Sequence, residues 1–145
     1  MDACSLYDAV IVARSRSPQY SGAAKAETAR AQGTNPLCGD RVRLSLCEER
    51  DGIRDLRHET RGCAICIAST DLMAETVTGR TKADALELAR RFTDMLNSQS
   101  SSADLDGEAG LPGVLQAFLP LRTHRSRLRC ATLPWTALGE ALKHD

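Results

Sequence analysis

The sequence predicts a mixed fold that combines an antiparallel pair of strands with several helices. Apolar and polar residues alternate with a period of two from Val42 to Cys47, which is typical of a half-buried strand. Asp51-Gly52 is a hairpin turn signal, and the charged return strand, Ile53 to Glu59, is expected at an edge of the sheet. Elsewhere apolar residues recur at helical spacing, so helices supply much of the rest of the core.

A first helix is expected to begin at Ser5, because this serine cap is followed three residues later by Asp8. An apolar stripe continues from there until Ser17-Pro18 ends the helix. The residues from 19 to 34 are small and polar with little periodicity, so we predict a surface loop over that stretch.

Helical spacing returns after the strand pair. One helix is predicted to begin within a residue or two of Cys63 and to end at Gly79, and a capping box at Thr81 opens the most amphipathic helix of the chain. The stretch 97–113 is rich in Ser, Asp and Gly and is predicted to be an exposed acidic connection. Leu133-Pro134-Trp135 then marks the expected start of a final helix.

The chain has 145 residues and is expected to form a single domain, residues 1–145. Lysine plus arginine number 19, as do aspartate plus glutamate, so charge gives no reason to expect nucleic acid or a membrane as a partner. No apolar run approaches the roughly 20 residues that span a bilayer, and we see no secretory signal, so a cytoplasmic protein is expected. There, six cysteines favour metal or sulfur chemistry over disulfides.

A thiol and a carboxylate flank a glycine in Cys38-Gly39-Asp40. The glycine permits backbone angles that let both donors converge on one small space, and this geometry suits a metal. Further thiols stand at Cys63 and Cys66, and at Cys130 near the C-terminus. One thiol from each of these three places, together with the aspartate, would make a four-ligand site.

The pair Cys63-x-x-Cys66 leaves an alternative open. A thioredoxin-like redox motif needs a preceding βαβ pattern and would make no use of Cys38, Asp40 or Cys130, and a zinc knuckle needs a second close pair of cysteines, which the sequence lacks. If a helix begins near Cys63, the two cysteines lie about 60° apart around its axis, so Cys66 is an alternative ligand. We prefer Cys63, because a ligand at the end of a strand is better fixed than one in a first helical turn.

Four arginines precede the last cysteine, at positions 122, 125, 127 and 129. We expect their positive charge to lower the pKa of Cys130 and to hold sulfur-derived anions. Cys47 falls on the polar face of its strand and Cys4 lies near the chain end, so neither is predicted to be a ligand.

Together these motifs resemble those of the U-type iron-sulfur assembly proteins, the family of IscU, SufU and the N-terminal domain of NifU. Asn35 to Asp40 and the following strand match the first family motif, and Gly62-Cys63 matches the second. The run from 127 to 135 is closest to the SufU branch, as are the acidic insertion and Arg129, where IscU-type proteins have a histidine. Departures from the SufU pattern are found at Arg61, Cys66 and Asp71.

This resemblance implies an α+β fold with a small antiparallel three-stranded sheet packed with helices on one face, as in SufE/NifU-like proteins. It implies Zn²⁺ as cofactor, and as partners a SufS-like cysteine desulfurase and downstream iron-sulfur assembly proteins. The implied zinc ligands are Cys38, Asp40, Cys63 and Cys130. By analogy with SufU, Cys38 would be displaced from zinc by a residue of the desulfurase and would accept the persulfide sulfur, with Arg127 stabilising the displaced thiolate.

Such a chain would be a sulfur carrier with sulfurtransferase-like activity rather than a stand-alone enzyme. Two alternatives stay open. In the first, the same four residues hold a [2Fe-2S] cluster or iron, and the protein is a scaffold that passes the cluster on. In the second, the chain is a structural zinc-binding module that only mediates protein contacts.

Overall fold

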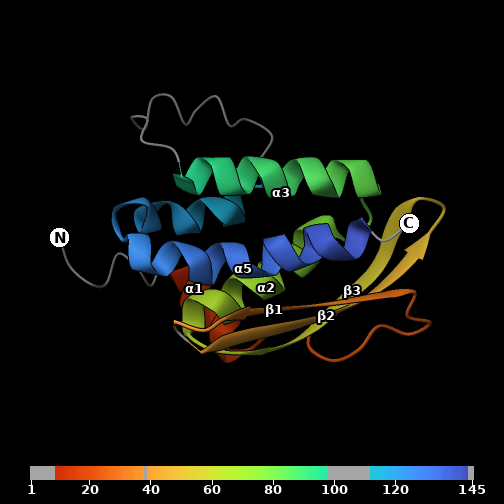
Figure 1. Cartoon of the computed structure of the whole chain (residues 1–145), viewed down its shortest axis with the longest axis horizontal. Coiled ribbons are helices and arrows are strands. Elements are labelled where there is room, and N and C mark those ends of the chain that lie inside the picture. The colour runs from red at the N-terminus through yellow and green to blue at the C-terminus, as the bar shows by residue number, and fades with distance from the viewer. Residues whose placement is uncertain (1–8, 38, 98–111, 144–145) are drawn as a thin grey trace.

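The computed structural model describes residues 9–37, 39–97 and 112–143, and it has a three-stranded antiparallel sheet with helices packed on one face (Figure 1). The expected fold class is therefore confirmed. In chain order the elements are α1 (Ala9–Arg16), β1 (Ala29–Asn35), β2 (Asp40–Glu49), β3 (Gly52–Arg61), α2 (Ala64–Val77), α3 (Lys82–Asn97), the 3-10 helix η3 (Gly113–Thr123) and α5 (Arg125–Leu142). No helix of the described ranges is long and apolar enough to cross a membrane.

Strand β1 corrects the prediction of a loop over residues 19–34. The strand pairs antiparallel with β2 from Ala29 opposite Leu46 to Asn35 opposite Asp40. Its residues are small and polar, so it lacks the apolar alternation by which a strand is recognised. Small size has a use at Gly33, where an added Cβ would lie 3.0 Å from a methyl carbon of Leu133 in α5.

Strand β2 is central and β3 forms an edge, as predicted. The alternation of side chains along β2 predicted that Cys47 lies on the polar, exposed face, yet this residue is only 7% exposed. The reason is that the segment 20–28 crosses this outer face of the sheet, where the Ala24 N–H donates to Ser45 Oγ over 2.9 Å. One half of the outer face is therefore covered by the chain itself.

The helices enclose the core on the other face of the sheet (Figure 1). Helix α3 is amphipathic as predicted and buries Phe92, whose ring stacks on Trp135 with centroids 4.8 Å apart. Helix α5 begins at Arg125, upstream of the start predicted at Leu133, and Pro134 lies inside it. Proline is common in the first turn of a helix, and for this reason the helix was predicted to start beside Pro134, although it begins upstream and continues through this residue.

A buried carboxylate joins the N-terminal elements to the rest of the fold. Asp71 in α2 is completely buried and accepts hydrogen bonds from the backbone N–H groups of Gln19 and Tyr20. Arg14 of α1 donates to it over 3.1 Å, and His58 Nε2 of β3 lies 2.9 Å from it. Helix α1 ends at Arg16, next to the predicted stop, whereas its predicted cap from Ser5 to Asp8 lies outside the described residues.

Candidate metal centre

Three elements bring metal-ligating side chains together at one end of the sheet. Asp40 is the first residue of β2, Cys63 immediately precedes α2, and Cys130 lies in α5. One carboxylate oxygen and the two sulfur atoms all lie within 4.8 Å of one another. Cys38, the other predicted ligand, lies outside the described residues. The structure thus brings together three of the four residues of the predicted set.

The hairpin between β1 and β2 positions Asp40. Gly39 has a φ of 75°, the left-handed conformation for which a glycine was expected at this position, and its N–H donates to Asn35 O over 2.8 Å. The Cys63 N–H donates to Asp40 Oδ1 over 3.1 Å. An added Cβ on Gly62 would lie 2.3 Å from that same oxygen, so only glycine leaves room for the carboxylate.

The second carboxylate oxygen of Asp40 fits a cation. Oδ2 is buried and has no hydrogen-bond partner among the described residues. Buried polar atoms are almost always paired, because desolvation without a partner is costly. A carboxylate oxygen facing two thiols is a donor set that Zn²⁺ accepts, so the residues present fit a metal ion.

The start of α2 favours the thiolate form of Cys63. A hydrogen bond with the Cys130 thiol is the main reason that the pKa of Cys63 falls to about 6. The backbone N–H groups of Cys66 and Ile65 also lower it, whereas burial and the Asp40 charge oppose the shift. A helix N-terminus favours a thiolate in this way, because its backbone N–H groups and its dipole stabilise negative charge.

Cys130 behaves oppositely, and the expectation that arginines lower its pKa is wrong. The hydrogen bond with Cys63, burial and the nearby Asp40 carboxylate all raise the pKa of Cys130. The thiol is fully buried, whereas Arg125 and Arg129 are exposed to solvent that screens their charge. A metal ion that binds here must therefore displace the Cys130 proton.

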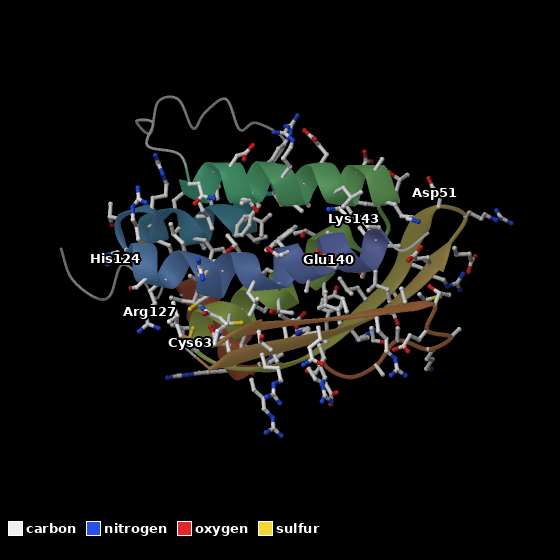
Figure 2. The ribbon with its side chains drawn as sticks, in the orientation of Figure 1. Asp51, Cys63, His124, Arg127, Glu140 and Lys143 are labelled. Carbon is white, nitrogen blue, oxygen red and sulfur yellow. The ribbon has the colours of Figure 1, made fainter. Side chains whose placement is uncertain are left out.

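Two other predicted residues, Cys66 and Arg127, do not belong to this donor group. Cys66 is fully buried in the hydrophobic core and is not a member of the donor group, to which it contributes only a backbone N–H near Cys63. Arg127 is half-buried in the first turn of α5, and its label lies at the same end of the molecule as that of Cys63 (Figure 2). Cys4 lies outside the described residues.

The contact by which the second motif supports the first was not predicted from the sequence. The Gly62-Cys63 pair receives the Asp40 carboxylate through the missing Cβ and the Cys63 N–H. The only signal for this contact was the glycine directly before the cysteine. A glycine at this position indicates that another group approaches the backbone closely, but it does not identify the side chain.

Comparisons with known proteins identify the family to which this chain belongs. The model of the NifU-like N-terminal domain family matches residues 6–107. The iron-sulfur cluster assembly scaffold protein IscU of Streptococcus pyogenes serotype M1 is 36% identical over 97% of this chain and 84% of its own length. The zinc-dependent sulfurtransferase SufU of Bacillus subtilis (strain 168) is 30% identical over 97% of this chain and 92% of its own length.

A solved structure has a fold similar to that of this chain. A protein of Fervidobacterium islandicum AW-1, described as an iron-sulfur cluster assembly scaffold for the SUF system, superimposes with a TM-score of 0.83 at 30% identity. The match covers 97% of this chain and 99% of that one. Family model, relatives and structure agree over most of the sequence, and the chain therefore belongs to the NifU-like N-terminal domain family.

Proposed function

We propose that this chain acts in iron-sulfur cluster assembly as a zinc-dependent sulfur acceptor that takes persulfide sulfur from a cysteine desulfurase. The observation that supports this most directly is the buried Asp40 oxygen beside the thiols of Cys63 and Cys130, which has no hydrogen-bond partner among the described residues. The nearly full-length similarity to a zinc-dependent sulfurtransferase supports the same reading. Cys38 is the proposed fourth ligand.

A bound zinc ion would keep its cysteine ligands deprotonated at neutral pH. Asp40 would supply a hard oxygen among soft sulfur donors, a mixed set in which the ligands differ in strength. The site would then hold thiols that are protected until a partner engages them. The described cysteines form no disulfide, and we expect the reaction to take place in the cytoplasm, where thiols stay reduced.

Cys38 is the proposed sulfur acceptor because the two thiols of the described donor group are poorly accessible. Cys130 is fully buried and Cys63 is half-buried, whereas Leu37 and Gly39, which flank Cys38, are exposed. The Cys38 thiolate would attack the terminal sulfur of the desulfurase persulfide. A new S–S bond forms on Cys38, the proton of the persulfide moves with its sulfur, and the enzyme's cysteine leaves as a thiolate.

Arg127 is proposed to stabilise the Cys38 thiolate before it attacks. Desulfurase turnover measured against the concentration of an Arg127→Ala variant tests this role. We expect a lower maximum rate at saturating protein with zinc content unchanged, because the charge acts on the reacting sulfur. An unchanged maximum with weaker half-saturation would assign Arg127 to docking instead.

The second candidate function is a scaffold on which a [2Fe-2S] cluster is assembled. The specific observation in its favour is the 36% identity to a relative named as a scaffold IscU protein. The same donors suit iron-sulfur ligation, because thiolates hold such clusters. A structural zinc module that only mediates protein contacts is a third candidate, and it would need no sulfur on Cys38.

Metal analysis of protein purified without oxygen separates these candidates. We expect stoichiometric zinc without visible absorbance, and a persulfide on Cys38 by mass spectrometry after incubation with a cysteine desulfurase and cysteine. The control is Cys47→Ala, which should keep both properties. Iron with visible absorbance would support the scaffold, and zinc without any persulfide would support the structural module.

A further inference from the structure

The outer face of the sheet is partly covered by the chain, and its part near the candidate metal centre is open. The segment 20–28 covers the half that contains Ser45 and Cys47, both of which are buried. The other half is uncovered and presents the exposed side chains of Arg41, Arg43 and Arg61. The chain thus leaves a basic part of its sheet open to solvent beside its candidate site.

The three arginines form one cluster. Arg41 lies directly opposite Arg61 in the register of β2 and β3, and Arg43 lies opposite Glu59. These four residues line a hollow of about 200 Å³. Like charges directly opposite each other destabilise a pair of strands. Within the described ranges, none of the three arginines forms an ion pair or a side-chain hydrogen bond.

The position of the cluster links it to the metal centre. Arg41 directly follows Asp40 in β2, and Arg61 stands two residues before Cys63. Successive side chains of a strand point to opposite faces of the sheet, so a molecule seated in this hollow would lie at the same end of the sheet as the donor group but on the face away from the Asp40 side chain. Any protein that reaches the metal centre from the open side of the sheet meets these arginines.

The chemistry favours carboxylates on a protein as the ligand. The planar guanidinium group binds carboxylates through two parallel hydrogen bonds, and it is suited to interfaces because it is weakly hydrated. Glu59 lies within the cluster and the chain as a whole has no net charge, which disfavours a long polyanion such as RNA. An acidic patch on a protein can match this small basic cluster more selectively than a long polyanion can.

We propose that Arg41, Arg43 and Arg61 form a docking surface for an acidic patch on the cysteine desulfurase. This inference rests on the proposed function, because it assumes that the desulfurase is the partner that approaches the metal centre. Each partner carboxylate would pair with an arginine and would relieve the repulsion between Arg41 and Arg61. Charge complementarity of this kind acts mainly on association and is screened by salt.

The test compares two triple variants with the same change in net charge. The docking variant is Arg41→Gln, Arg43→Gln and Arg61→Gln. The control variant is Arg50→Gln, Arg54→Gln and Arg90→Gln, which removes three exposed arginines away from the metal centre. Desulfurase turnover is measured against the concentration of each protein at low and high ionic strength, after zinc analysis has confirmed equal metal content.

We expect the docking variant to need about tenfold more protein for half-saturation at low ionic strength, with its maximum rate unchanged. Raising the salt should weaken the wild type and the control variant but have little further effect on the docking variant. Half-saturation equal to that of the wild type would overturn the docking surface while leaving the proposed function intact.

Two further outcomes would also contradict the inference. If the wild-type protein does not stimulate a desulfurase at all, the proposed function fails, and the inference fails with it. If the docking variant loses binding to tRNA in a filter assay but keeps normal desulfurase kinetics, the cluster is a nucleic-acid site and not a protein docking surface.

Discussion

At the scale of single residues, the candidate site depends on a missing side chain. Asp40 can approach the backbone at Gly62 because that residue has no Cβ, and the Cys63 N–H then holds the carboxylate in place. The second oxygen of the same carboxylate stays unpaired among the described residues. One glycine thereby orients an aspartate toward two thiols.

Replacing Gly62 by alanine tests this arrangement. The new methyl group would displace the Asp40 carboxylate, so we expect zinc affinity to fall by about tenfold while the fold persists. Competition with a chromogenic chelator measures the affinity. Gly79→Ala is the matched control, because Gly79 also has a positive φ but nothing lies within 4 Å of its added Cβ. Wild-type affinity in the Gly62 variant would show that the carboxylate does not bind the metal.

The two cysteines at the start of α2 are expected to have different roles. Cys63→Ala should strip zinc from the site, because its thiol belongs to the donor group. Cys66→Ala should retain zinc and lose about 1 kcal/mol of unfolding free energy, because its thiol packs in the core. Metal analysis and urea unfolding measure the two effects. Full zinc in the Cys63 variant would instead identify Cys66 as a competent ligand.

At the scale of elements, the sequence predicts best what apolar periodicity marks. Helix α3 agrees with its pattern because it has one buried face, and so does the first half of strand β2, whereas the second half of β2 is buried on both faces. Strand β1 was missed because its pairing is made by backbone groups and its residues are small. The start of α5 was missed because its first residues are mostly polar and Pro134 imitates a helix start. The donor residues were identified one by one, but their contacts required the tertiary structure.

Asp71 links α1, the following turn and β3 to α2, and its replacement by asparagine should loosen them. Burial alone would raise the pKa of Asp71, but the hydrogen bonds from His58 and the backbone of Gln19 and Tyr20 outweigh it, so the pKa is lowered below 3.8. Asp71→Asn should cost about 3 kcal/mol at pH 7, because it leaves buried donors without their charged acceptor. Urea unfolding measures this loss.

The lowered pKa also gives the sign of the pH dependence. The contribution of the Asp71 carboxylate to the free energy of unfolding is fully present above its pKa in the unfolded chain, 3.8. It is lost as the pH falls through its lower pKa in the folded protein. The difference in stability between wild type and Asp71→Asn should therefore shrink below about pH 4. Asp94→Asn, on the exposed face of α3, is the control and should differ little from wild type at any pH. A constant difference down to pH 2.5 would contradict this reading.

At the scale of the whole molecule, the candidate metal centre lies at one end of the hydrophobic core, to which the buried Cys130 also belongs. The core is formed by α2, α3, η3 and α5 against the inner face of the sheet. The donors instead join the ends of β2, α2 and α5 at one tip of the molecule, far from the labelled Asp51 at the opposite tip (Figure 2). A chain of this size buries enough apolar surface to fold without a metal.

Removing zinc should therefore weaken the tip without unfolding the protein. With chelator we expect a lower melting temperature but unchanged far-UV circular dichroism at 25 °C, because bound metal stabilises only the state that binds it. Amide exchange should accelerate at Asp40, Cys63 and the first turns of α5, and should stay slow around Phe92 in α3. A Cys130→Ala variant is the control, since chelator should not change its melting temperature. Complete unfolding by chelator would mean that the core alone does not hold the fold, and the metal would then be structural as well as chemical.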